Sequence, residues 1–138
     1  AISPWNFPLN LALAPLAGIL SAGNRVMLKP SELTPASSDL TKLMVEEFFD
    51  ESEIAVFIGD PEVGAAFSGL AFDHLIFTGG TAIAKHVMKA ASENLVPLTL
   101  ELGGKSAAII YPDADINQAV ESTVKGIFNS FMIGITTL

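Results

Sequence analysis

Residues 100–106, Leu-Glu-Leu-Gly-Gly-Lys-Ser, place one carboxylate, Glu101, at the end of an apolar run and immediately before two glycines. The alternation over residues 97–102 predicts a buried strand that ends at this turn. Burying a carboxylate costs free energy unless the group is solvated, paired or protonated, and burial raises the pKa of a carboxyl toward the range of a general base. The double glycine permits a sharp turn and the close approach of a ligand. The stretch therefore predicts either a catalytic base or a plain strand end.

Strand and helix patterns alternate along the rest of the chain. The expected strands cover residues 1–3, 25–29, 53–58, 73–77, 98–102 and 106–110. The expected helices cover residues 8–22, 35–49, 62–68, 81–92 and a last segment that follows a cap at 113–115 and ends near Asn129. At helical spacing, the second helix carries Leu40, Leu43, Met44 and Phe48, and the fourth carries Ile83, Val87 and Ala91 on one side. This alternation predicts an α/β fold with a parallel sheet and right-handed crossovers.

The composition excludes several classes of protein. With 138 residues, 50% of them hydrophobic and 16% charged, the chain has the size of one domain and is too apolar to be disordered. A net charge of −8 disfavours binding to nucleic acid, which needs clustered Lys and Arg. No apolar run approaches the ~18 uninterrupted residues of a membrane span, so no membrane partner is expected. The absence of cysteine excludes disulfides and cysteine-based metal sites and is compatible with a cytoplasmic protein.

The remaining metal-binding residue types indicate no metal site. His74 and His86 have no cysteine or carboxylate at ligand spacing, so neither is assigned a catalytic role. Asp113 and Asp115 precede a helix, where capping is a better interpretation than metal binding. We therefore expect no metal.

Polar residues follow several of the expected strands, which is where open α/β sheets bind ligands. Lys29 and Glu32 could hydrogen-bond the hydroxyls of a ribose, and a solvated surface ion pair is the alternative. The glycine-containing turns at 59–64 and 77–81 both lead into helices whose free N–H groups suit a pyrophosphate, but ordinary helix entry is the better interpretation of the first turn. The side-chain amide of Asn6 can stabilise an oxyanion or, alternatively, bond the backbone in a turn.

Four motifs occur in an order that is typical of one enzyme family. They are residues 4–9 (PWNFPL), residues 28–32 (LKPSE) followed by Thr34-Pro35, residues 77–81 (FTGGT), and the Glu101 motif. On these motifs, the chain from Ile2 to about Asn129 resembles the NAD(P)-dependent aldehyde dehydrogenases. Residues 10–15 (NLALAP) and 94–97 (NLVP) are most similar to the coniferyl-aldehyde branch of that family.

The resemblance implies a fragment of a cofactor-binding domain, with an α/β, Rossmann-like parallel sheet, truncated, and helices on both of its faces. Residues 1–130 would form a partial NAD-binding domain, and residues 131–138 an aberrant or junction tail. The parent enzyme would oxidise coniferyl aldehyde or another aromatic aldehyde to a carboxylic acid with reduction of NAD. Its partner would be a small-molecule aldehyde, and the parent would be a cytoplasmic homo-oligomer. Because Glu32 would repel a 2′-phosphate, NAD is expected rather than NADP.

The resemblance also implies roles for individual residues. Glu101 would activate water as the general base, and the amide of Asn6 would stabilise the oxyanion of a thiohemiacetal. The coenzyme would contact Lys29 and Glu32 at its adenosine ribose, Trp5 beside the nicotinamide, Gly80 and Thr81 near the phosphates, and Gly103.

The nucleophile of the family is absent from this sequence. In these enzymes a cysteine follows the general base in a Gly-Gln-x-Cys pattern, whereas here Asn129-Ser130 leads into Phe131. No other residue replaces that thiolate, so the chain as given is expected to be inactive. The alternatives are an acyl-phosphate or semialdehyde dehydrogenase of the same family, a noncatalytic nucleotide-binding module, and a structural fragment that binds nothing.

Overall fold

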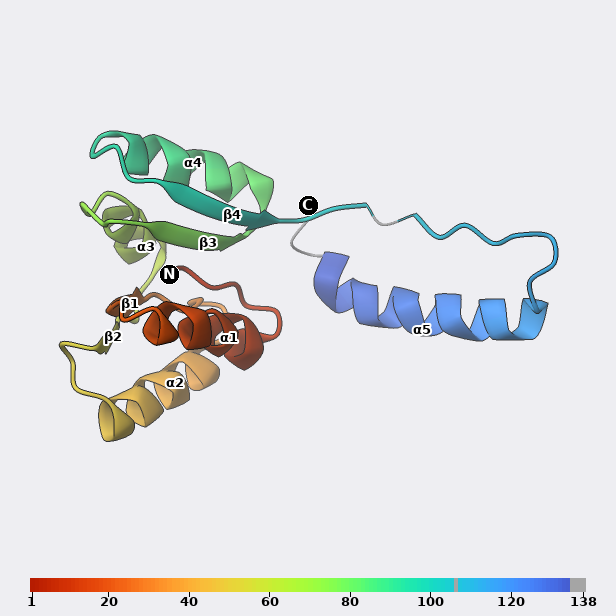
Figure 1. Ribbon diagram of the computed structural model, residues 1–138, viewed down its shortest axis with the longest axis horizontal. Coiled ribbons are helices and arrows are strands. Elements are labelled where there is room, and N and C mark those ends of the chain that lie inside the picture. Colours follow the sequence, from red (N-terminus) through yellow and green to blue (C-terminus); the bar gives the residue numbers. More distant parts are fainter. Residues whose placement is uncertain (106, 135–138) are drawn as a thin grey trace.

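The computed structural model describes residues 1–105 and 107–134. Helices and strands alternate along the chain (Figure 1): α1 (Pro8–Ser21), β1 (Val26–Leu28), α2 (Pro35–Phe48), β2 (Ile54–Val56), α3 (Pro61–Ser68), β3 (Leu75–Gly79), α4 (Thr81–Ser92), β4 (Leu98–Leu102) and α5 (Ile116–Gly134). Pro8, Pro35 and Pro61 each take the first helical position, where the missing N–H removes no hydrogen bond. Every element expected before residue 103 is present, although the strand expected at 1–3 is reduced to a bridge at Ile2.

The segment at Ile2 joins two pairs of parallel strands into one sheet. β1 pairs with β2, and β3 pairs with β4, both in parallel. Ile2 forms parallel bridges to Lys29 on one side and to Phe77 on the other. The strand order is therefore β2–β1–Ile2–β3–β4. Because the chain moves outward from Ile2 first on one side and then on the other, the carboxyl end of this segment is the switch point where such sheets bind ligands.

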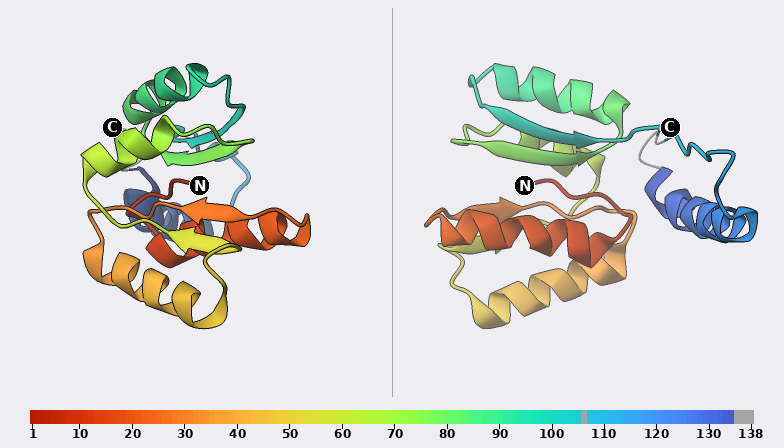
Figure 2. Two further views of the ribbon diagram at one scale, coloured as in Figure 1. Left: turned by 90° about the vertical axis from the view of Figure 1, so that its left-hand side faces the viewer. Right: turned by 45° about the vertical axis from the view of Figure 1, so that its right-hand side comes forward.

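Helices cover both faces of the sheet. α1 and α2 lie on one side of the strands and α4 lies on the other (Figure 2). The buried apolar residues form two clusters, which comprise Ala12, Leu16, Val26, Leu28, Val45, Ile54 and Val56 beside α1 and α2, and Phe67, Leu75, Phe77, Ala84, Val87, Ala91 and Val96 beside α3 and α4. The expected α/β fold, with a parallel sheet and helices on both faces, is confirmed.

The strand expected at 106–110 is wrong for the part of it that the structure describes. Ser106 lies outside the described residues, and residues 107–110 form no strand. β4 is the outermost strand, and residues 107–110 lead away from it toward α5, which stands apart from the sheet (Figure 1). Ile109 is 82% exposed, so the apolar pattern that predicted a buried strand has no covering element among the described residues.

The apolar faces expected on two helices differ from those that the structure buries. In α2 the expected residues Leu40, Leu43, Met44 and Phe48 are exposed, and the buried ones are Ser38, Thr41 and Val45. In α4 Val87 and Ala91 are buried as expected, but Ile83 is exposed and Ala84 takes its place. Small residues lie where the helix approaches its neighbours closely, and the large apolar side chains of α2 remain mostly exposed.

The last helix begins as expected and extends further than expected. Asp115 caps α5, since its Oδ1 accepts a hydrogen bond from the N–H of Gln118 at 2.8 Å. The helix continues past Asn129 to Gly134, and residues 135–138 lie outside the described part of the chain. The division into a domain at 1–130 and a tail at 131–138 stays a prediction. Among the described residues, no helix is both long enough and apolar enough to cross a membrane.

Candidate functional site

Asn6 and Glu101 come from distant parts of the sequence and line one cavity of about 490 Å³. The cavity lies beside the carboxyl ends of β3 and β4, between these strands and α1. Its other lining residues are mostly apolar, namely Phe7, Leu11, Ala14, Pro15, Ile76, Thr78 and Leu102. An amide and a carboxylate thus converge on an apolar space, which is the composition that small-molecule sites usually have.

Local structure explains how Asn6 reaches this cavity. Asn6 lies in the turn between the Ile2 segment and α1, and it is 3% exposed. Phe7, the N-cap of α1, has φ 47° and ψ 51°, so the backbone bends sharply directly after Asn6. The carbonyl of Phe7 then accepts the N–H of Leu11 at 2.9 Å, which begins the helix. The bend keeps the amide of Asn6 at the carboxyl edge of the sheet.

The register of β4 against β3 determines where Glu101 points. Glu101 is the partner of Thr78, and both residues line the cavity. Leu98 and Leu100 alternate with Glu101 and pack on the opposite face, against the cluster beside α4. The expectation of a buried strand is wrong here, because β4 has a partner only in β3 and Glu101 is exposed. The burial expected around this carboxylate is therefore absent from the described part of the protein.

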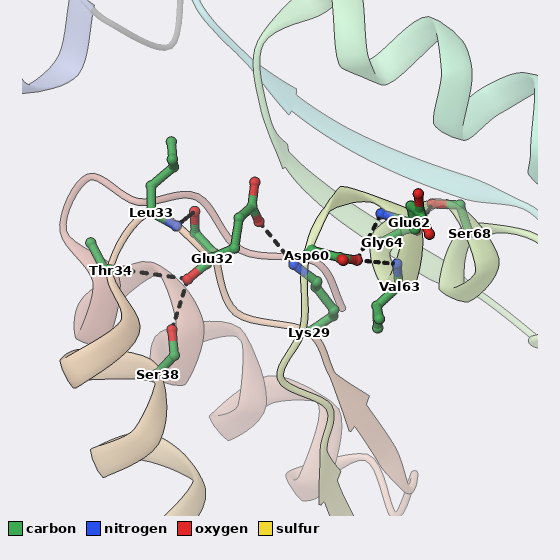
Figure 3. Close-up of polar contacts among 11 residues, drawn as sticks. Lys29, Glu32, Leu33, Thr34, Ser38, Asp60, Glu62, Val63, Gly64 and Ser68 are labelled. Carbon is green, nitrogen blue, oxygen red and sulfur yellow. Dashed lines mark hydrogen bonds and ion pairs between the residues drawn. The ribbon is translucent and has the colours of Figure 1, made fainter.

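Lys29 and Glu32 form an ion pair at the carboxyl end of β1. The Nζ of Lys29 donates to Oε2 of Glu32 at 2.9 Å (Figure 3). The side chain of Lys29 is only 3% exposed, whereas that of Glu32 is 36% exposed. Partial burial raises the pKa of the Glu32 carboxyl, but the backbone N–H of Glu32 and the Lys29 ammonium outweigh this effect and hold the pKa below its usual value. In this pair, the anionic carboxylate of Glu32 is partly open to solvent, and the side chain of Lys29 is buried.

Hydrogen bonds within the turn hold this pair in place. The hydroxyl of Ser31 accepts the N–H of Leu33 at 3.2 Å. The carbonyl of Ser31 in turn accepts the hydroxyl of Ser38, a buried residue of α2, at 2.8 Å. These contacts tie the loop to α2, so Glu32 is presented from a fixed backbone. The alternative of a freely solvated surface ion pair does not fit the burial of Lys29.

The two helix entries at this edge of the sheet differ in whether a side chain caps them. At α3 the Oδ1 of Asp60 accepts the N–H groups of Glu62 and Val63 at 3.0 and 3.1 Å, which supports the interpretation of that turn as ordinary helix entry. At α4 the N-cap is Gly80, and no side chain among the described residues caps the helix. The first turn of α4 therefore keeps backbone N–H groups that can bind a phosphate.

The other expected contact residues lie near this edge but do not line the cavity. Trp5 is half-buried in the turn before Asn6, Thr81 begins α4, and Gly103 directly follows β4. Whether they contact a coenzyme stays a prediction. Sequence reasoning missed Thr78, which lines the cavity beside Glu101, and Asp60, which lies near Glu32. The signal for both was their position in the two glycine-containing turns at 59–64 and 77–81.

The described part of the structure contains no cluster of side chains suited to a metal ion. No group of three or more His, Asp or Glu residues among residues 1–105 and 107–134 could hold a metal ion. His74 lies at the opposite end of the sheet, where its Nε2 is 2.9 Å from the hydroxyl of Thr99.

Comparison with known sequences matches this chain to aldehyde dehydrogenases. The model of the "Aldehyde dehydrogenase family" matches residues 1–131. A probable coniferyl aldehyde dehydrogenase of Caulobacter vibrioides is 65% identical over 91% of this chain, and a coniferyl aldehyde dehydrogenase of a Pseudomonas species is 64% identical over 83% of it. These matches cover 26% and 24% of the two relatives, so the chain spans about a quarter of the length of the curated relatives it matches.

Solved structures show the same similarity. Substrate-bound AldH of Staphylococcus aureus matches 83% of this chain with a TM-score of 0.80 and 45% identity. Betaine aldehyde dehydrogenase of the same organism, solved in complex with NAD⁺, matches 91% with a TM-score of 0.81 and 40% identity. Each match covers 25% of the solved chain.

Proposed function

The chain belongs to the aldehyde dehydrogenase family, and we propose that it supplies the coenzyme-binding part of an NAD-dependent enzyme that oxidises an aldehyde to a carboxylic acid. The observation that carries this proposal is the convergence of Asn6 and Glu101 on one cavity, at the same edge of the sheet as the turn that holds Lys29 and Glu32. A donor for an oxyanion and a carboxylate that can activate water thus lie together at the edge where an α/β sheet binds its coenzyme.

The residues at this edge fit NAD. The Glu32 carboxylate is open to solvent and can accept hydrogen bonds from ribose hydroxyls, while the buried Lys29 holds it in place and can donate to the same sugar. The uncapped first turn of α4 after Gly80 suits the pyrophosphate. When bound, NAD accepts a hydride from the substrate. Complexes of related enzymes with NAD⁺ support this assignment.

Asn6 and Glu101 would act at successive stages on the substrate. The amide of Asn6 donates a hydrogen bond to the oxyanion that forms when a nucleophile attacks the aldehyde. Glu101 accepts a proton from the water that later releases the acid, and its exposed position at the cavity gives it access to that water. The sequence contains no cysteine, so we propose that the nucleophile lies in a part of the intact enzyme outside this chain and that the chain alone is inactive.

An aromatic aldehyde is the proposed substrate. Two relatives at 65% and 64% identity are named as coniferyl aldehyde dehydrogenases. The apolar lining around Phe7 and Leu11 is compatible with an aromatic ring. The cytoplasmic location and homo-oligomeric state expected for the intact enzyme stay predictions. A noncatalytic nucleotide-binding module is the second candidate, and the absence of cysteine favours it.

A chimera distinguishes these two functions. Residues 1–129 would replace the homologous part of the Pseudomonas coniferyl aldehyde dehydrogenase, which supplies the remainder of an enzyme. We expect the chimera to form NADH from coniferyl aldehyde, Glu101→Gln to lower kcat by about 10²–10⁴-fold, and Asn6→Ala to lower it by about 10²–10³-fold.

Glu93→Gln is the matched control, because Glu93 lies at the other end of α4, away from the cavity. A chimera that binds NAD but forms no NADH would favour the noncatalytic module. Equal activity of the Glu101→Gln and Glu93→Gln chimeras would contradict the role given to Glu101.

A further inference from the structure

Asp60 places a second carboxylate beside the Lys29–Glu32 pair. β1 and β2 are paired so that Leu28 opposes Val56, which brings the turns after these two strands together. In Figure 3, Asp60 lies near the Lys29–Glu32 pair, with its carboxylate directed at the first turn of α3. The side chain of Lys29 runs along the first turn of α3, since a Cβ added to Gly64 would lie 3.8 Å from Lys29 Cε. Carboxylates from two separate loops therefore lie at this edge, and only that of Glu32 forms an ion pair with Lys29 in the described part of the chain.

The carboxylate of Asp60 is fixed in position. Its Oδ1 accepts two hydrogen bonds from the first turn of α3, and Pro61 follows it at the first helical position. A helix amino terminus normally attracts phosphate through its free N–H groups and its positive dipole end. Here a side chain that carries negative charge already occupies those groups, so the end of α3 cannot bind a phosphate on the ribose.

The charges at this edge do not balance. Lys29 contributes one positive charge, whereas Glu32 and Asp60 contribute one negative charge each. The two carboxylates interact, since the charge of Asp60 raises the pKa of Glu32. The hydrogen bonds of Glu32 and the charge of Lys29 lower that pKa by more, so the pKa is lowered overall. A phosphate monoester carries a charge of about −1.5 to −2 near neutral pH, whereas a ribose hydroxyl carries none.

We infer that Asp60 is a second residue, besides Glu32, that makes this site select NAD over NADP. This inference rests on the proposed function, in which the Lys29–Glu32 pair binds the adenosine ribose. Asp60 acts in two ways: its charge repels a 2′-phosphate, and its hydrogen bonds remove the N–H groups that would otherwise hold one. Neutralising Glu32 alone should therefore leave part of the selectivity in place.

Calorimetric titration of the 138-residue chain with NAD and with NADP tests the inference. Asp60→Asn removes the charge but keeps a side-chain oxygen, and asparagine caps helices as well as aspartate does. We expect Asp60→Asn to raise the affinity for NADP relative to NAD roughly fivefold, because the variant removes one negative charge that opposes a phosphate with a charge of about −1.5 to −2. Glu32→Gln should give a relative gain of its own, and the double variant should exceed either single variant.

Asp115→Asn is the matched control, because Asp115 caps α5 with the same kind of hydrogen bond and α5 stands apart from this edge. Circular dichroism would establish that each variant folds. A ratio of NADP to NAD affinity that changes no more in Asp60→Asn than in Asp115→Asn would overturn the inference alone. If the unaltered chain bound neither nucleotide, the proposed function would be wrong and this inference with it.

Discussion

Neutralising Glu32 should destabilise the fold more than removing the charge of its partner Lys29. The side chain of Lys29 is 3% exposed, and its ammonium forms an ion pair with the Glu32 carboxylate at 2.9 Å. Breaking a buried pair by removing one partner costs about 3–5 kcal/mol, and an exposed pair contributes about 0.2–1 kcal/mol. Because Glu32 is 36% exposed, we expect Glu32→Gln to lower the free energy of unfolding by an intermediate amount, about 1–3 kcal/mol.

Lys29→Met should cost less, about 0–1 kcal/mol, because methionine keeps the buried apolar stem and leaves Glu32 with access to water. Urea unfolding followed by circular dichroism measures both changes. Glu46→Gln is the control, since the Lys42–Glu46 pair on α2 is longer, at 3.6 Å, and exposed on both sides. If Lys29→Met cost as much as Glu32→Gln or more, the description of a buried cation held by a half-exposed carboxylate would be refuted.

Other features of the fold can be tested by single substitutions. Gly79→Ala should lower the free energy of unfolding by about 1–3 kcal/mol, because the new Cβ would lie 2.6 Å from Cζ of the buried Phe77; Gly104→Ala, which meets no atom within 4 Å, is the control in the same urea assay. The pKa of Glu32 in the folded state is below its usual 4.5, so its contribution to stability is present above pH 4.5 and is lost as the pH falls through the folded-state pKa. Glu32→Gln should therefore make stability depend less on pH in the acid range. The effect should be partial, because the pKa of Asp50 is also lowered and acts in the same direction. The exposed apolar face of α2 should cause self-association in sedimentation experiments, and Phe48→Asp should reduce it; a monomer that binds no hydrophobic dye would contradict this.

The order and type of the elements could be predicted because their signals are local. Prolines at the first helical positions and the capping aspartate at 115 act within one turn of helix, and the apolar runs of β1 to β4 are short and bounded by turns. The Lys29–Glu32 pair was also predictable, since its two members are three residues apart. In each case the residues that determine the structure are close together in the sequence.

The errors arise where tertiary contacts decide the outcome. The sequence pattern of α2 marks its largest apolar residues, whereas the contact with α1 and β2 selects the small side chains of Ser38 and Thr41. The burial expected for Glu101 depended on a strand beyond β4 that residues 107–110 do not form. Asp60 could be recognised as a helix cap from its neighbours, but its position beside Lys29 depends on the pairing of β1 with β2.

The most direct test of the central claim, that the carboxyl edge of this sheet is an NAD site, is an NMR titration of the isotope-labelled chain with NAD. We expect saturable shifts of the backbone amides at residues 29–32 and in the first turn of α4, with little change near Arg25 and Asp73 at the opposite edge. Shifts confined to that opposite edge, or no saturable shifts at all, would contradict the claim.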